Sequence, residues 1–129
     1  MNNLNNFNVE ILFNINNENS PKVYLEVNNP KIKGQLKKLI DQIPEGFRLP
    51  TKEELVQIYY FLKENKPNIL NNLPPKYIWS GTPYGYGGNH YVVSFVDGFE
   101  KQLDVNSILP ILFVKEIEQP EEFKPKKTK

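Results

Sequence analysis

The chain is 129 residues long, contains no cysteine and one histidine, and carries a formal net charge of +1. This length predicts one domain with a core large enough to fold without disulfides or metals. The missing cysteines exclude disulfides, thiolate nucleophiles, zinc fingers and iron–sulfur ligation, and one histidine excludes a multi-histidine metal site within one subunit. The balanced charge offers no general attraction for a nucleic-acid polymer or a membrane surface. We therefore expect neither a metal nor a cofactor.

The first residues carry no targeting signal. Residues 1–7 lack a basic region, and Glu10 interrupts the apolar run at 9–13, so no secretory signal is expected. No apolar stretch is long enough to span a membrane. These features predict a cytoplasmic protein or, if a phage encodes the chain, one found in the virion or the host cytoplasm.

Two strands and a helix are predicted from the first third of the chain. Apolar residues alternate over 9–15 and again over 23–27, and the polar segment 16–21 between them favours a turn, which predicts an N-terminal β-hairpin. Helical spacing then predicts a first helix over 32–43, ended by Pro44. The apolar positions of this helix are Ile32, Leu36, Leu39, Ile40 and Ile43.

The strongest local signal is the start of a second helix. The Thr51 hydroxyl is expected to accept from the backbone N–H of Glu54, while the Glu54 carboxylate accepts from the Thr51 N–H, which makes a capping box. The helix therefore begins at about Lys52 and ends no later than Pro67. Its apolar face is predicted to be buried and contains Leu55, Ile58, Tyr59 and Leu62.

Short strands are predicted over the second half of the chain. They cover 77–79, 91–96, 99–105 and 111–117, with loops at 68–75 and 83–89. Asp97-Gly98 is typical of a hairpin turn between the second and third of these strands. Residues 119–129, rich in lysine and proline, are expected to be a disordered basic tail, which leaves 1–118 as one domain. Strands before two helices and more strands after them predict an α+β fold.

Three segments of the chain resemble a known family. Gly-Phe-Arg-Leu-Pro-Thr-Lys-Glu-Glu-Leu (46–55), Ile-Trp-Ser-Gly-Thr-Pro-Tyr (78–84) and Tyr-Val-Val-Ser-Phe-Val-Asp-Gly (91–98) are similar to motifs of bacterial and phage C-type-lectin-like domains. The C-terminal domain of a Legionella collagen-like adhesin typifies these domains. The match follows the family order over about 46–117. The resemblance implies two helices packed on short twisted antiparallel sheets, and a protein that binds without catalysing a reaction.

The same fold includes formylglycine-generating enzymes and iron-dependent sulfoxide synthases. The first group needs cysteines and the second needs histidines that this chain lacks, and Leu55 stands where both tend to have tryptophan. The Glu-Pro-Asn and Trp-Asn-Asp motifs of calcium-dependent lectins do not occur, nor do the cysteines common in the adhesin type. We therefore expect a protein that is not an enzyme, and the fold alone does not name its ligand.

The predicted ligand site is the glycine-rich loop 81–91. Tyr84, Tyr86, His90 and Tyr91 surround its glycines, and tyrosine offers a rigid contact area with a polar tip. In the alternative interpretation, the tyrosines pack in the core and the glycines only make a turn. A phosphate loop is not expected, because a strand and not a helix follows the glycines.

Arg48, Trp79 and His90 each have a functional and a structural interpretation. Arg48 is a candidate ligand-binding residue because a guanidinium clamps a carboxylate or phosphate bidentately, but a structural role before the second helix is favoured. Trp79 is predicted to lie in the core rather than to form a sugar platform. His90 is interpreted as a polar loop residue, because no Ser–His–Asp spacing accompanies it.

Two functions remain open from the sequence. One is a non-catalytic protein that recognises a glycan or other small ligand through the aromatic loop. The other is a phage or mobile-element accessory protein that inhibits a host factor by protein contact or sequesters a signalling nucleotide. The partner is thus a small molecule, a glycan or a host protein, and the oligomeric state stays open.

Overall fold

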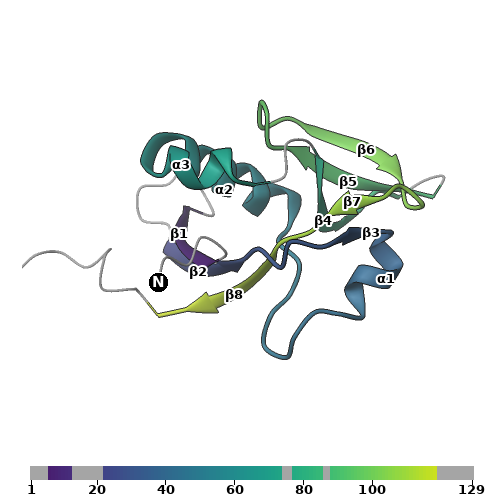
Figure 1. The fold of residues 1–129 in the computed structure, drawn as a ribbon, viewed down its shortest axis with the longest axis horizontal. Helices are drawn as coiled ribbons and strands as arrows, with labels where there is room; N and C mark the ends of the chain where they lie inside the picture. Colours follow the sequence, from purple (N-terminus) through teal and green to yellow (C-terminus); the bar gives the residue numbers. More distant parts are fainter. Residues whose placement is uncertain (1–5, 13–21, 74–76, 86–87, 119–129) are drawn as a thin grey trace, which may run out of the picture.

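The computed structural model describes residues 6–12, 22–73, 77–85 and 88–118 (Figure 1). Helices and antiparallel sheets are both present, which confirms the α+β class. The elements are β1 (Asn6–Leu12), β2 (Lys22–Asn28), β3 (Lys33–Gly34), α1 (Leu36–Ile40), α2 (Lys52–Asn65), α3 (Pro67–Asn71), β4 (Tyr77–Pro83), β5 (Asn89–Ser94), β6 (Glu100–Asp104), β7 (Leu109–Pro110) and β8 (Phe113–Ile117).

The described strands form three small sheets. Their orders are β1-β2-β8, β3-β7 and β4-β5-β6, and every pairing is antiparallel. The segment from β7 to β8 links two of them, because Pro110 pairs with Lys33 while Val114 pairs with Val27. The expected N-terminal hairpin requires residues 13–21, which lie outside the described residues, as do Phe13 and Ile15 of the first expected strand.

Helix α2 begins where the sequence predicts. Thr51 Oγ1 accepts from Glu54 N at 3.1 Å, and Glu54 Oε1 accepts from Thr51 N at 2.9 Å, so the predicted capping box is confirmed. The apolar face predicted for this helix is also buried. Negative charge in the first turn, from Glu53 and Glu54, complements the helix dipole.

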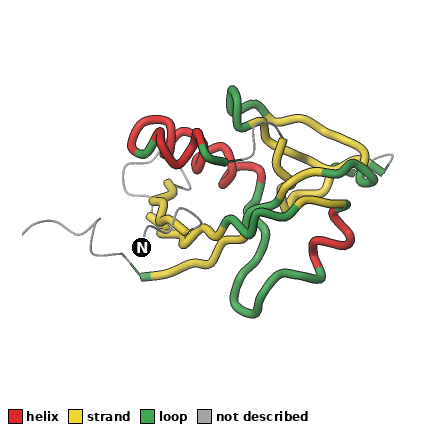
Figure 2. Tube along the Cα trace, in the orientation of Figure 1, coloured by secondary structure: helices red, strands yellow, loops and turns green. Residues whose placement is uncertain are grey.

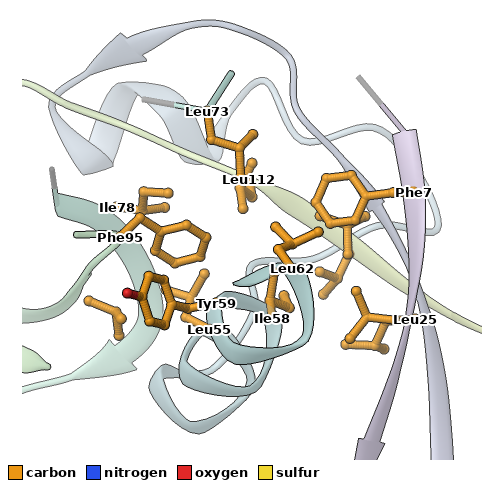
Figure 3. Packing of buried hydrophobic residues seen from close by; sticks show 14 of the residues in the cluster. Phe7, Leu25, Leu55, Ile58, Tyr59, Leu62, Leu73, Ile78, Phe95 and Leu112 are labelled. Atoms are coloured by element: carbon orange, nitrogen blue, oxygen red, sulfur yellow. The ribbon is translucent and has the colours of Figure 1, made fainter. Parts of the chain in front are cut away.

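The buried apolar side chains of the described residues pack in two clusters. The first core cluster surrounds the buried face of α2 and joins it to the β1-β2-β8 sheet and to β4 and β5. In Figure 3, Phe7 and Leu25 lie to one side of the α2 side chains and Ile78 lies to the other. The second core cluster consists of Leu36, Leu39, Trp79, Val92, Ile111 and Phe113. Trp79 is fully buried, as predicted, and its indole Nε1 donates to the Gly34 carbonyl at 3.0 Å.

The expected helix over 32–43 is wrong in its length, because α1 spans only Leu36–Ile40. Lys33 and Gly34 instead pair with β7, and glycine disfavours a helix interior. The remaining residues before α2 form the long loop that runs away from α1 and returns (Figure 2). Ile40, expected on the apolar face, is 47% exposed.

The loop expected over 68–75 is also wrong, because α3 occupies Pro67–Asn71 and makes three described helices instead of two. The end of α2 at Asn65 confirms the predicted limit at Pro67, and Pro67 itself stands at the start of α3. Proline is favoured there because the first helical N–H needs no partner within the helix.

The last strand begins at Phe113 rather than at Ile111. The tail 119–129 lies outside the described residues.

Candidate functional site

Two of the predicted site residues, Tyr84 and Tyr91, come together at one end of the β4-β5-β6 sheet. Their ring centroids are 5.4 Å apart and their planes meet at 83°, an edge-to-face pair. The Nζ atom of Lys52, at the first position of α2, lies 4.9 Å from the Tyr91 ring centroid. We call Tyr84, Tyr91 and Lys52 the aromatic corner. Tyr86 lies outside the described residues.

Carboxylates surround the ammonium group of the aromatic corner. Lys52 Nζ donates to Glu53 at 3.0 Å and to Glu100 at 3.2 Å, and the Lys52 backbone N–H donates to Thr82 Oγ1 at 3.0 Å. The hydrogen bond with Glu53 is the main cause that raises the pKa of Lys52, and the same bond lowers the pKa of Glu53. An aromatic pair thus stands beside hydrogen-bonding groups of both signs.

His90 does not join the aromatic corner, because it lies on the opposite face of β5 from Tyr91. Successive side chains of a strand point to opposite faces. The His90 ring meets Trp79 edge-on at 5.8 Å, and its Nε2 donates to the Ser80 carbonyl oxygen at 2.8 Å. The alternation of β5 thus separates two neighbours in sequence that were expected to act together.

Arg48 is engaged in an ion-pair cluster with Glu54 and Glu116. Its two terminal nitrogens donate to the two oxygens of Glu54 at 2.7 and 2.9 Å, and Nη2 also reaches Glu116 at 3.3 Å. The hydrogen bond to Glu54 is the main cause that raises the pKa of Arg48. The backbone of Arg48 exchanges two hydrogen bonds of 2.8 Å with Val114. The favoured structural interpretation of Arg48 agrees with these contacts, which join the start of α2 to β8.

A groove of about 660 Å³ lies at the other end of β4, and the sequence interpretation did not find it. Its polar walls come from the segment that follows β2 and from the end of α3, and its apolar walls come mainly from the region of β7. We call it the lysine groove. Its polar and aromatic lining residues are Asn29, Lys31, Lys33, Asn72 and Tyr77. No local pattern could reveal it, because the pairing of β3 with β7 creates it.

Exposed apolar side chains gather at the turn between β5 and β6. Tyr60 is 42% exposed, while Val96 and Phe99 are each 64% exposed. Tyr60 and Phe99 line a hollow of about 510 Å³. We call Tyr60, Val96 and Phe99 the apolar patch. Gly98 makes the turn with φ +82°, a conformation that favours glycine, as expected for the Asp97-Gly98 signal.

The comparisons with known proteins add no relative, since no family model and no curated protein matches the chain. Within residues 6–12, 22–73, 77–85 and 88–118, no three histidine, aspartate or glutamate side chains form a group that could hold a metal ion. Of the described helices, none combines the length and the apolar character needed to cross a membrane.

Proposed function

We propose that the chain is a non-catalytic binding protein that recognises a glycan or another small ligand through the aromatic corner and the loop 81–91. The observation that carries the proposal is the contact of the Tyr84 and Tyr91 rings beside Lys52 and Glu100. A sugar presents C–H groups that pack on aromatic rings and hydroxyls that bond to ammonium and carboxylate groups. The corner offers both kinds of contact within one surface.

The C-type-lectin-like fold is part of the same proposal. Its support is the order of the elements, with a capped helix followed by the three strands β4, β5 and β6 and by a closing strand, β8. The three segments that carry the resemblance overlap α2, β4 and β5 and the loops beside them. In this proposal, Arg48 and His90 position the helix and the sheet, and the tyrosines contact the ligand.

The test is a glycan array followed by calorimetry on the full chain and on Tyr84→Ala and Tyr91→Ala. Loss of an aromatic contact at the centre of a site should weaken binding about tenfold or more. The control is Tyr60→Ala, which removes a partly exposed tyrosine from the middle of α2. Unchanged affinity in both corner variants, with the melting temperature retained, would remove the aromatic corner as the site.

The second candidate function is inhibition of a host factor by protein contact, and the apolar patch favours it. Contiguous exposed apolar side chains commonly mark protein interfaces. Phe99→Ser should abolish capture of a host protein from a lysate, while Ile108→Ser, at an apolar residue that is 57% exposed outside the patch, should not. Equal capture by both variants would exclude the patch as the contact surface.

A further inference from the structure

The lysine groove is rich in positive charge that no described residue neutralises. Lys31 and Lys33 both line it and are exposed, and neither forms an ion pair with any described residue. Its described lining contains no aspartate or glutamate. A third cation stands nearby, because Lys101 Nζ lies 5.9 Å from the ring centroid of Tyr77 in the groove wall. The groove therefore favours an anion.

Asn29 adds a buried hydrogen-bond donor to the same wall. It is only 3% exposed, and its Oδ1 accepts from the backbone N–H of Lys31 at 3.0 Å. This bond fixes the orientation of the side-chain amide. The Nδ2 group has no acceptor among the residues that the structure describes. Buried polar groups normally have a partner, so an unpartnered donor in a groove wall points to an acceptor on a ligand.

The rest of the groove lining is mainly apolar and contains one aromatic ring. Leu73, Leu109 and Pro110 line it together with the partly buried Tyr77, and the exposed Ile108 stands at its rim. The volume of about 660 Å³ is within the range of small-molecule sites. A ligand that fills the groove must therefore combine an apolar, ring-shaped body with a hydrogen-bond acceptor and a negative charge.

We propose that the lysine groove binds a small nucleotide. The base packs against Tyr77 and the aliphatic wall, a base or ribose oxygen or a ring nitrogen accepts from Asn29 Nδ2, and the phosphate lies between Lys31 and Lys33. A fatty acid carries its charge and its acceptors on one carboxylate and has no ring to pack against Tyr77, and inorganic phosphate leaves the apolar wall empty. The inference does not rest on the glycan proposal, because the groove and the aromatic corner are at opposite ends of β4.

The first experiment is calorimetry of the full chain with AMP, GMP, CMP and UMP, each at about 1 mM, the concentration at which a weak but specific site is half-filled. At least one nucleotide should bind, and its parent nucleoside and inorganic phosphate should each bind at least tenfold more weakly. The proposal is overturned if none of the four nucleotides binds. Equal binding of inorganic phosphate also overturns it, because the apolar wall then contributes nothing.

The second experiment separates the groove from the rest of the surface. Asn29→Asp keeps an oxygen for the Lys31 N–H but replaces the amide donor with a second acceptor, and Lys33→Glu reverses a charge. Each should weaken nucleotide binding at least tenfold. The matched control is Lys37→Glu, on an exposed position of α1 outside the groove, which should change the affinity less than twofold.

Tyr91→Ala distinguishes this site from the aromatic corner. It should leave nucleotide affinity unchanged even if it abolishes glycan binding. The groove assignment fails if Tyr91→Ala abolishes nucleotide binding, or if Asn29→Asp and Lys33→Glu bind as tightly as the parent chain with unchanged melting temperatures.

Discussion

The start of α2 and the lysine groove use charged residues in opposite ways. At the start of α2, Arg48 is paired with Glu54 and Glu116, and Lys52 with Glu53 and Glu100. In the groove, Lys31 and Lys33 have no ion pair with a described residue. The paired charges hold separate elements together, so a ligand that binds them must compete with contacts inside the protein. The groove lysines are available without such competition, which supports the proposal that an anion binds in the groove rather than at the start of α2.

The largest effect on stability is expected from Glu54→Ala. The substitution removes the carboxylate half of the capping box, the bond that the Glu54 side chain accepts from Thr51 N, and leaves the Arg48 guanidinium without its closest carboxylate, while the Glu54 side chain is 4% exposed. Loss of a half-buried ion pair together with one capping-box hydrogen bond to a charged group should lower the free energy of unfolding by about 2 kcal/mol. Denaturant unfolding measures this change.

Glu53→Ala is the matched control for that prediction. Its carboxylate is 69% exposed and takes no part in the capping box, so the loss should be below about 1 kcal/mol. Equal losses in the two variants would show that the ion-pair cluster does not hold α2 in place.

Lys31→Gly, in the groove, is expected to change the free energy of unfolding by a smaller amount and in the opposite direction. The backbone φ of Lys31 is +60°, and among the described residues Lys31 is the one non-glycine residue with a positive φ. Glycine relieves this conformation, so the free energy of unfolding should rise by about 1 kcal/mol while nucleotide binding weakens. Lys33→Gly is the control, because β3 has no such strain and glycine there should cost about 0.5–1 kcal/mol. Destabilisation by both substitutions would show that the φ of Lys31 carries no cost.

The smallest effect concerns the pKa of Glu53. Its carboxyl has a lowered pKa in the folded chain, chiefly through the hydrogen bond from Lys52. The ionised carboxylate therefore stabilises the fold above the unfolded pKa of about 4.3. This stabilisation is lost as the pH falls through the lower, folded pKa. Lys52→Met should return the pKa of Glu53 toward its ordinary value and reduce the melting temperature slightly above that pH. An NMR titration measures the pKa. Lys63→Met, at the far end of α2, should leave the titration of Glu53 unchanged.

The start of α2 was predictable because its chemistry is local. Thr51 and Glu54 are three residues apart, and a capping box needs nothing from the rest of the chain. The separation of His90 from Tyr91 also follows from strand alternation. It was not predicted because both residues were assigned to the loop 81–91, whereas β5 begins at Asn89. The bidentate contact of Arg48 with Glu54 was only partly predictable, because its six-residue separation crosses a loop.

The lysine groove was not predictable, because it depends on contacts between distant segments. Residues 32–43 have helical spacing, yet Lys33 pairs with Pro110, seventy-seven positions along the chain. That pairing shortens the predicted helix and brings Lys31 and Lys33 beside the apolar wall of the groove. Similarly, α3 was missed because Pro67 can end one helix and begin another, and only the tertiary packing decides between the two.

The burial of Trp79 gives the second core cluster its own fluorescence signal. The chain has one tryptophan, and its indole lies with Leu36 and Ile111 and is bonded to Gly34. Tryptophan emission therefore follows the α1 side of the molecule alone, while far-UV circular dichroism is dominated by α2, the longest described helix. Unfolding curves recorded by both signals will coincide if the two clusters melt as one cooperative unit, and will separate if the groove side opens first.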